Sequence, residues 1–294
     1  MNRSPEWYEE RRRYVGASEV ASILGLNPYQ TPFEVWAVKT GQMEPFKGNE
    51  VTRLGNVFEP VIIDEAEREL GPIARTCTYA REGSIVRAEL DGQVVSSGEP
   101  VEAKTAGLMS GRVGPDWGDD GLVTEVGQIP EHYYVQVQAQ LYVSSRELAH
   151  LFALLPGRGF VHYQIEAEEK VQKGIMDSVD DWWQRHVVGD EAPDITVATP
   201  SKAVLDRLHR DPHDVADLGD DVDGWFNELQ LAKSYKSDAD RAVKDLNAKI
   251  IAALGNCEIG VTPNGRRVTY KETARKGYEV ADTTYRTLRI KESK

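Results

Sequence analysis

Asp91 and the tripeptide Glu102-Ala103-Lys104 are the residues of this chain whose types and spacing could do chemistry. The stretch around them predicts a strand over residues 84–90, an Asp91-Gly92 turn, and a later strand that opens just before Glu102. Because side chains alternate along a strand, Glu102 and Lys104 should point to the same face. Asp91, at the end of the neighbouring strand, can join them there.

The chemistry that such a set supports is hydrolysis beside a divalent metal ion. Two carboxylates supply oxygen ligands that suit Mg²⁺, and a lysine can orient or deprotonate a water next to the ion. The same residues also suit a solvated hairpin face with a single ion pair, because the pattern is short and its residue types are common. Other parts of the chain must decide between the two interpretations.

Composition narrows the class of protein. With 294 residues, the chain is long enough for one large domain, or for a domain of about 200 residues with an appendage. No apolar run approaches the length of a membrane span, and the first residues lack the apolar core of a signal peptide, so we expect a cytoplasmic protein without membrane contact. Two cysteines without a CxxC pattern indicate neither a disulfide framework nor a structural zinc site. The net charge of −13 argues against a general polyanion binder.

The hydrophobic pattern predicts an alternation of helices and strands up to residue 188. Ser18 is expected to cap a short helix after Gly16, and Thr31-Pro32 to open a second one. The remaining predicted elements are a helix over 53–70, three strands between 73 and 104, a glycine-rich loop over 107–121, a helix over 130–143, strands over 149–155 and 160–165, and a helix over 171–188.

The pattern of apolar and polar residues changes beyond Pro193. Apolar residues at steps of three and four over residues 222–254 predict one long helix or a helical hairpin, and short strands should flank the Pro263-Asn264-Gly265 turn. We therefore predict a first domain over residues 1–195 and a helical and short-strand appendage over 196–294. From Asn264 onward the appendage carries nine Lys or Arg against four acids.

Two further positions strengthen the metal interpretation. Glu59 falls within the predicted helix that precedes the three strands and could complete a metal site from above. Gln136 and Gln140 lie one turn apart on the helix after them, with Tyr133 three residues before Gln136. An amide on that helix face could hold a water beside the metal.

This order of elements resembles the PD-(D/E)xK nucleases, and more closely the phage lambda exonuclease family, also called YqaJ-type viral recombinases. The amino-terminal segment is similar to that family's opening signature, with Trp7-x3-Arg11, Gly16-Ala17-Ser18-Glu19, Tyr29-x-Thr31-Pro32 and Trp36-x3-Thr40-Gly41. The resemblance covers residues 5–188. It implies an α/β fold of the restriction-endonuclease-like type, a central mixed sheet flanked by helices, followed here by the carboxy-terminal appendage.

The resemblance also assigns roles at the metal site. Asp91 and Glu102 match the main metal ligands, with the Ala103 backbone carbonyl and Glu59 as additional ones. Lys104 matches the catalytic lysine.

Three more residues take roles from the resemblance. Gln136 matches the glutamine that supports the lysine. Arg11 and Ser18 match positions that bind the 5′-terminal phosphate of DNA. Arg12 and Arg13 leave the register of that arginine open, and Arg11 is preferred because it keeps the seven-residue step to Ser18.

The activity that the resemblance implies is 5′-to-3′ digestion of linear double-stranded DNA, which leaves 3′ single-stranded tails for recombination. It implies two Mg²⁺ ions, for which Mn²⁺ can substitute, a homo-oligomeric ring that is a trimer in the prototype, and a single-strand annealing partner protein. Two alternatives stay open: an endonuclease or repair nuclease of different polarity, and a non-catalytic protein that binds DNA ends.

The chain departs from the family pattern at one place near the site. Glu89-Leu90 precedes Asp91-Gly92 where the family often has Ser-Pro, so a phosphate-contacting serine is missing and Glu89 adds negative charge near the metal ligands. There is also no GxxxxGK[ST] motif, so no built-in ATP-driven motor is expected.

Overall fold

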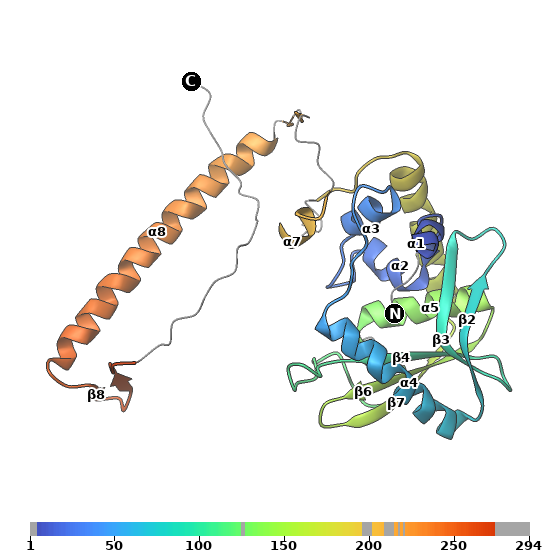
Figure 1. The fold of residues 1–294 in the computed structure, drawn as a ribbon, viewed down its shortest axis with the longest axis horizontal. Coiled ribbons are helices and arrows are strands. Elements are labelled where there is room, and N and C mark those ends of the chain that lie inside the picture. Colours follow the sequence, from blue (N-terminus) through green and yellow to red (C-terminus); the bar gives the residue numbers. More distant parts are fainter. Residues whose placement is uncertain are drawn as a thin grey trace. The chain divides into compact units, whose positions relative to one another are not determined.

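The computed structural model describes residues 5–124, 127–195, 202–208, 215–216, 218–219 and 221–273 (Figure 1). The chain divides into two compact units, Met1–His209 and Arg210–Lys294. The sequence predicted a boundary after residue 195, and the sheet and the candidate site lie within the first unit.

A mixed sheet of seven strands forms the centre of the first unit (Figure 1). Its path runs β1-β3-β4-β6-β7-β5, and β2 pairs with β3 off this path. The antiparallel pairs are β2–β3, β3–β4 and β6–β7, and the parallel pairs are β1–β3, β4–β6 and β5–β7. The strands are β1 (Val15–Gly16), β2 (Ile73–Ala80), β3 (Val86–Val94), β4 (Pro100–Thr105), β5 (Gly121–Leu122), β6 (Leu148–Leu155) and β7 (Gly159–Glu166).

Helices cover both faces of this sheet. On one face α4 (Glu50–Leu70) buries Ile62, Ile63 and Ala66 against β2, β3, β4 and β6. On the other face α5 (Glu131–Ser144) buries Val137 and Leu141 against β6 and β7. The predicted α/β class, a central mixed sheet flanked by helices, is confirmed.

Further helices pack outside α5 and complete the first unit. α2 (Ala17–Ile23), α3 (Pro32–Lys39) and α6 (Glu169–Trp182) share a core with β3 and with the outer side of α5. The chain continues from α6 as a π-helical turn, Trp183–Val188, so the helix predicted over 171–188 is continuous but changes its winding. The remaining elements of this unit are α1 (Pro5–Arg11) and α7 (Lys202–Leu205).

The caps of the amino-terminal helices were predicted with mixed success. Thr31 caps α3 as expected, because its hydroxyl accepts a hydrogen bond from the Glu34 amide at 3.3 Å. Ser18 does not cap α2: the cap is Gly16, and Ser18 lies within the first turn. Glu19 fixes this start, since its carboxylate accepts from the Gly16 amide at 2.7 Å.

A chain of four titratable side chains joins the end of α4 to the sheet. Glu69 on α4 contacts His162 Nδ1 on β7 at 2.6 Å, His162 Nε2 contacts His150 Nδ1 on β6 at 2.9 Å, and His150 Nε2 contacts Glu99 at 3.1 Å. Burial lowers the pKa of the His150 imidazole, and although Glu99 acts in the opposite direction, the lowered value prevails.

These four side chains make the stability of the fold depend on pH. In the unfolded chain His150 takes up a proton near its ordinary pKa of about 6.5, whereas the folded protein resists that proton. The stabilisation is therefore complete above about pH 6.5 and is lost as the pH falls below it. We expect the free energy of unfolding, measured in urea, to fall between pH 7.5 and pH 5. The slope should flatten in His150→Gln and persist in the control His186→Gln. An unchanged slope in His150→Gln would contradict this origin.

The second unit contains one long helix and a small hairpin. α8 (Asp221–Leu254) is a single helix of 34 residues, which decides between the two predicted alternatives. β8 (Ile259–Val261) and β9 (Arg267–Thr269) pair around the predicted Pro263-Asn264-Gly265 turn. Within the described residues, none of the helices combines the length and the apolar character needed to span a bilayer.

Candidate active site

The candidate site lies where β3 and β4 part. The two strands pair only at Gly92↔Val101 and Gln93↔Pro100. Asp91, the next residue of β3, is held instead through its side chain, which accepts a hydrogen bond from the Ala103 amide at 2.9 Å. The predicted Asp91-Gly92 turn is therefore wrong, because both residues lie inside the continuous strand β3. The carboxylate of Asp91 nevertheless reaches the start of the Glu102–Lys104 segment, as the spacing suggested.

Glu102 is buried under α5 and is held by three side chains. Its Oε1 accepts from Gln136 Nε2 at 2.6 Å and pairs with the Lys104 ammonium, and its Oε2 accepts from Gln140 Nε2 at 2.5 Å. Glu102 and Lys104 thus share one face of β4, as strand alternation requires. Only 3% of Glu102 is exposed, so its charge acts at low dielectric.

Asp91 lies in an environment with an excess of negative charge. Burial and then the charge of Glu102 raise its pKa to about 8, against the opposing effects of Lys104 and the Ala103 amide. The charge of Glu59 on α4 adds to the same rise. The neighbouring groups only partly compensate the charges of the two carboxylates. Such a pair is suited to a divalent cation, because the cation would remove the repulsion that raises the pKa of Asp91.

Lys104 remains a charged ammonium in this arrangement. Burial lowers its pKa, but the charges of Glu102 and Asp91 outweigh burial and raise the pKa above its ordinary value. Its Nζ also lies 5.1 Å from the centre of the Tyr133 ring. Tyr133 is the first-turn residue of α5 that the sequence placed three positions before Gln136.

The predicted metal ligands are brought together in part. Asp91 and Glu102 flank the Ala103 amide, while Glu59 acts on Asp91 through its charge. Among the described residues, no three His, Cys, Asp or Glu side chains gather closely enough to hold a metal between them. The donor set that fits a cation is therefore the Asp91–Glu102 pair, and the roles of Glu59 and of the Ala103 carbonyl stay predictions.

Arg11 and Ser18 meet at the start of α2. Arg11 Nη2 donates to Ser18 Oγ at 3.3 Å and lies 3.6 Å from Glu19. A Cβ placed on Gly16 would lie only 1.9 Å from Arg11 Nη2, so the guanidinium occupies the space that any other residue at position 16 would fill. Arg12 instead pairs with Glu9 at 3.0 Å. The geometry therefore favours Arg11 over Arg12 as the arginine that stands beside Ser18.

The buried Lys39–Glu19 ion pair supports the position of Arg11. Lys39 Nζ donates to the Arg11 and Tyr14 carbonyls, each at 2.7 Å, and to Glu19 at 2.8 Å. Because Lys39 fixes the backbone on which Arg11 stands, the guanidinium is positioned by the fold rather than by chance contacts. A cavity of about 250 Å³ opens here, lined by Trp7, Tyr8, Arg11, Arg12, Glu19, Gln30, Val38, Lys39, Pro45 and Phe46.

Strand β3 connects the two clusters. Its burial alternates along the strand, so Arg87, Glu89 and Asp91 share the less buried face. Trp7 Nε1 donates to Glu89 at 3.3 Å, and the charge of Glu89 acts on Arg11. Same-face neighbours on a strand are about 7 Å apart, so Glu89 stands one such step from Asp91. The residue that departs from the family pattern thus lies between the predicted phosphate site and the predicted metal site.

A larger cleft of about 590 Å³ opens at the first turn of α5. The His132 and Tyr133 rings lie at a tilt of 49° with their centres 4.0 Å apart, and the Tyr29 ring lies edge-on to His132 at 5.9 Å. Arg112 adds an exposed positive charge to the wall. Because Lys104 contacts the Tyr133 ring, this cleft begins at the candidate catalytic lysine.

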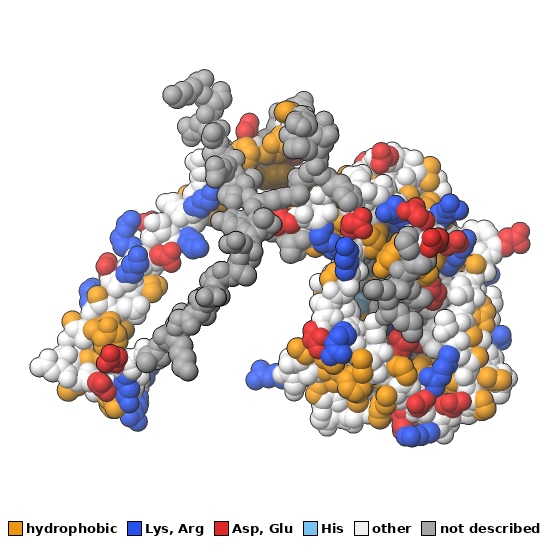
Figure 2. Space-filling model, in the orientation of Figure 1, with side chains coloured by type: hydrophobic (Ala, Val, Ile, Leu, Met, Phe, Trp, Pro, Cys, Tyr) orange, Lys and Arg blue, Asp and Glu red, His pale blue; other side chains and the backbone are white. Residues whose placement is uncertain are grey.

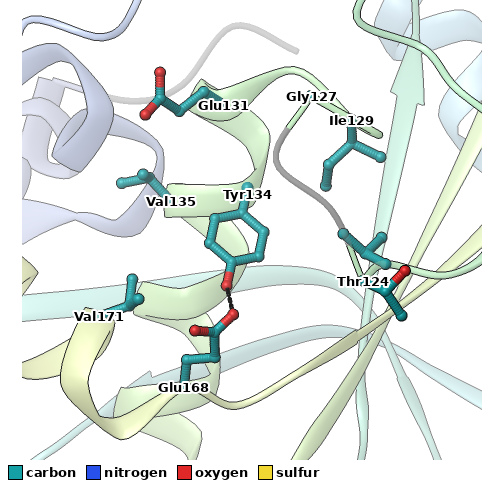
Figure 3. Close-up of a pocket in the computed structure, with 9 residues that line it drawn as sticks. Thr124, Gly127, Ile129, Glu131, Tyr134, Val135, Glu168 and Val171 are labelled. Atoms are coloured by element: carbon teal, nitrogen blue, oxygen red, sulfur yellow. Dashed lines mark hydrogen bonds between the residues drawn. The ribbon is translucent and has the colours of Figure 1, made fainter.

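A further pocket, of about 300 Å³, lies between α5 and α6 (Figure 3). Its walls are largely apolar, and the Tyr134 hydroxyl donates to Glu168 across it. None of the predicted site residues lines it. The chemistry of the chain is therefore not expected there.

Gln140 is the site residue whose role the sequence did not assign. The spacing placed it one turn after Gln136, but only the fold shows that the two amides hold the two oxygens of one carboxylate. Gln138 between them points elsewhere, donating to the Glu166 carbonyl at 2.7 Å.

Gln140→Met should therefore lower the hydrolytic rate by about 10-fold, because one Glu102 oxygen loses its partner and the carboxylate can rotate. Gln138→Met is the matched control, since it removes an equally buried amide of the same helix without touching Glu102. The two variants should show similar losses of thermal stability but different rates. Equal rates would show that Gln140 does not position Glu102.

Comparison with known proteins finds one family to which the chain is similar. Residues 6–147 match the YqaJ-like viral recombinase domain. The protein YqaJ of Bacillus subtilis strain 168 is 28% identical over 267 residues, which are 88% of this chain and 81% of that protein. Over these residues the chain is similar to the YqaJ-like viral recombinase family. The resemblance predicted from the Asp91, Glu102-x-Lys104 and amino-terminal motifs is thus confirmed.

More distant similarities surround this family match. Protein D345L of African swine fever virus is 37% identical over 67 residues, 23% of this chain and 19% of that protein. An alkaline exonuclease of Laribacter hongkongensis aligns with a TM-score of 0.48 at 17% identity, over 63% of this chain and 94% of that one. A phage-related exonuclease of Haemophilus somnus 129PT aligns with a TM-score of 0.46 at 14% identity, over 63% of this chain and all of that one.

Proposed function

We propose that this chain is a metal-dependent exonuclease that digests linear double-stranded DNA from its 5′ ends. The observation that carries the proposal is the fork between β3 and β4, where Asp91 and Glu102 meet beside Lys104. The Arg11–Ser18 cluster, which β3 connects to this fork, supports the polarity. An arginine fork and a hydroxyl at a helix start are suited to a terminal phosphate.

Each residue has a defined part in this proposal. Asp91 and Glu102 hold the cation, and Gln136 fixes the Glu102 carboxylate through its 2.6 Å hydrogen bond. Lys104 lies beside both carboxylates, whose charges raise its pKa in the metal-free site, and it would orient the attacking water and offset developing negative charge.

The proposed cation is Mg²⁺, for which Mn²⁺ can substitute, with two ions at full occupancy. When bound, it supplies Lewis-acid stabilisation of the phosphate and of the leaving 3′-oxygen. Asp91 and Glu102 are hard oxygen donors, as this ion requires.

We extend the proposal to the wider setting that the family resemblance implies. The products are 3′ single-stranded tails for recombination, the assembly is a ring such as a trimer, the partner is a single-strand annealing protein, and the place of action is the cytoplasm of the host cell. The local charges agree with a DNA groove in an acidic chain, since Arg11, Arg12 and Lys39 line one cavity and Arg112 lines another. Only the groove has to neutralise phosphates.

The deciding experiment compares linear duplexes that differ only in their 5′ ends. We expect release of nucleotides in Mg²⁺ or Mn²⁺, faster from a 5′-phosphate than from a 5′-hydroxyl, and none from closed circular DNA. Degradation of circles, or indifference to the 5′-phosphate, would favour an endonuclease or a repair nuclease of different polarity. Binding of DNA ends without any degradation would leave only a non-catalytic end-binding protein.

A further inference from the structure

Within the described residues of its own unit, the long helix α8 buries no side chain, although its sequence has the apolar pattern of a helix that packs against another. Apolar side chains are exposed along it (Figure 2). Among the large ones, Trp225 is 43%, Leu246 57% and Ile250 47% exposed. A helix of 34 residues is about 50 Å long, and helices of this kind gain most of their stability from packing.

Apolar residues of α8 form a heptad seam, although Leu231, Tyr235 and Ile251 are exposed outside it. Ten positions at alternating steps of three and four run along one seam, and nine of them are apolar. The a and d positions are Val222, Trp225, Leu229, Ala232, Lys236, Ala239, Val243, Leu246, Ile250 and Ala253. A 3.5-residue repeat sustained over more than four heptads is the pattern of a coiled coil, so the seam requires another helix.

We propose that α8 pairs with α8 of a second copy of this chain in antiparallel orientation, with the twofold axis between Ser237 and Asp238. In a parallel pair each seam residue meets itself, so Lys236 would face Lys236 and three layers would contain only alanine. In the antiparallel pair Lys236 faces Ala239. Every alanine of the seam then meets a longer side chain, and Trp225 meets Ile250.

The flanking charges specify the same orientation and register. In an antiparallel pair the e positions of the two helices face each other, and so do the g positions. With the axis as stated, Lys233 faces Asp240 of the second copy, and Glu228 faces Lys249 of the second copy. Within the described part of the chain, none of these four residues has an ion-pair partner of its own.

Shifted registers are opposed by the same residues. A slip of one heptad in one direction brings Lys233 against Lys233 of the second copy, and a slip in the other direction brings Asp240 against Asp240. Each slip also leaves two seam residues of each helix unpaired at the ends. A single alignment therefore combines filled layers with opposite charges, which is how coiled coils select their partner.

The pairing has a structural consequence for the assembly. In the antiparallel pair the amino-terminal ends of the two α8 helices lie about 50 Å apart, so the two nuclease units are attached at opposite ends. It also requires an even number of chains, which a three-membered ring reaches when its three α8 helices pair with those of a second ring.

Charge exchange in the full-length chain tests the proposal, with mass in solution measured by sedimentation equilibrium. Lys233→Glu alone and Asp240→Lys alone should each weaken dimerisation by about 10-fold, because two attractive pairs become two repulsive ones. The double variant Lys233→Glu/Asp240→Lys should restore it. Lys244→Glu and Asp245→Lys, on the outer face, are the matched controls and should change nothing.

Other outcomes would overturn the proposal. In a parallel pair Lys233 would face Glu228, so the double variant would stay as weak as Lys233→Glu. A monomeric wild-type chain, an odd number of chains, or single variants that dimerise as well as wild type would likewise refute the antiparallel pair. All of these variants change only exposed side chains of α8, so we expect the first unit to fold as in the wild-type chain.

Discussion

Glu102→Gln is expected to lower the rate of DNA hydrolysis by at least about 10³-fold while leaving binding of DNA ends nearly intact. The reason is that Glu102 combines two functions at one position. Its charge is half of the pair that fits the cation, and its two oxygens are the acceptors for Gln136 and Gln140. A glutamine keeps the shape but loses the charge, and it also brings an amide donor against donors that are already there.

The measurement is nucleotide release from a linear duplex at saturating Mg²⁺, with end binding followed separately in Ca²⁺ or EDTA. Asp91→Asn should show a loss of the same order, because it removes the other half of the pair. Glu59→Gln should show a smaller loss, since Glu59 acts on Asp91 only through its charge. Glu67→Gln, an exposed residue of α4, is the control that should match wild type. A Glu102→Gln protein with more than a tenth of the wild-type rate would contradict the assigned site.

The same-face relation of Glu102 and Lys104 could be predicted from sequence because it depends only on strand alternation. The Arg11–Ser18 pair was instead taken from the family resemblance, although it too is a local relation between residues seven positions apart. Such relations are local, and local geometry is what residue spacing encodes.

Two predictions, the Asp91-Gly92 turn and the Ser18 cap, are wrong for the same reason: tertiary contacts outweigh the local preference. An Asp-Gly pair between apolar residues is a strong turn signal, yet Asp91 continues β3 because its side chain replaces the missing β4 pairing by accepting from the Ala103 amide. Ser18 is a better cap than glycine by intrinsic preference. Gly16 is the cap because the Arg11 guanidinium fills the space of a Cβ there.

Gln140 illustrates a different limit. Its position one turn after Gln136 was visible in the sequence, but Gln138 is just as polar and just as buried. Only the crossing of α5 over β4 decides which amides reach Glu102. Sequence spacing can therefore predict which helix face carries the amides. The partner of each amide depends on how the helix lies on the sheet.

Gly16→Ala is expected to remove about 100-fold of the preference for a 5′-phosphate over a 5′-hydroxyl end, although it changes no charge. Gly16 has φ −76° and ψ 146°, a conformation that alanine adopts freely, so the backbone can stay. The added methyl would stand 1.9 Å from Arg11 Nη2. The flexible guanidinium must therefore move away, and a displaced arginine loses its paired hydrogen bonds to the phosphate.

Rates on the two kinds of duplex end give this preference as a ratio, which cancels changes in overall activity. Arg11→Gln should give nearly the same ratio as Gly16→Ala. Gly174→Ala serves as control, because a Cβ on this residue of α6 meets nothing within 4 Å. If Gly16→Ala kept the full preference, the phosphate would have to be bound by another group, such as Arg12 in the same cavity.

The double variant Gly16→Ala/Arg11→Gln separates displacement of the guanidinium from general damage to the helix start. If both single changes act through the same guanidinium, the second adds almost nothing to the first, and the double variant should show the ratio of Arg11→Gln alone. If Gly16→Ala instead disturbed α2 or the Glu19–Lys39 pair, the effects would add, and the thermal stability of the protein would fall with them. A strongly non-additive ratio with unchanged stability is therefore the result expected for a guanidinium that owes its position to the missing side chain of Gly16.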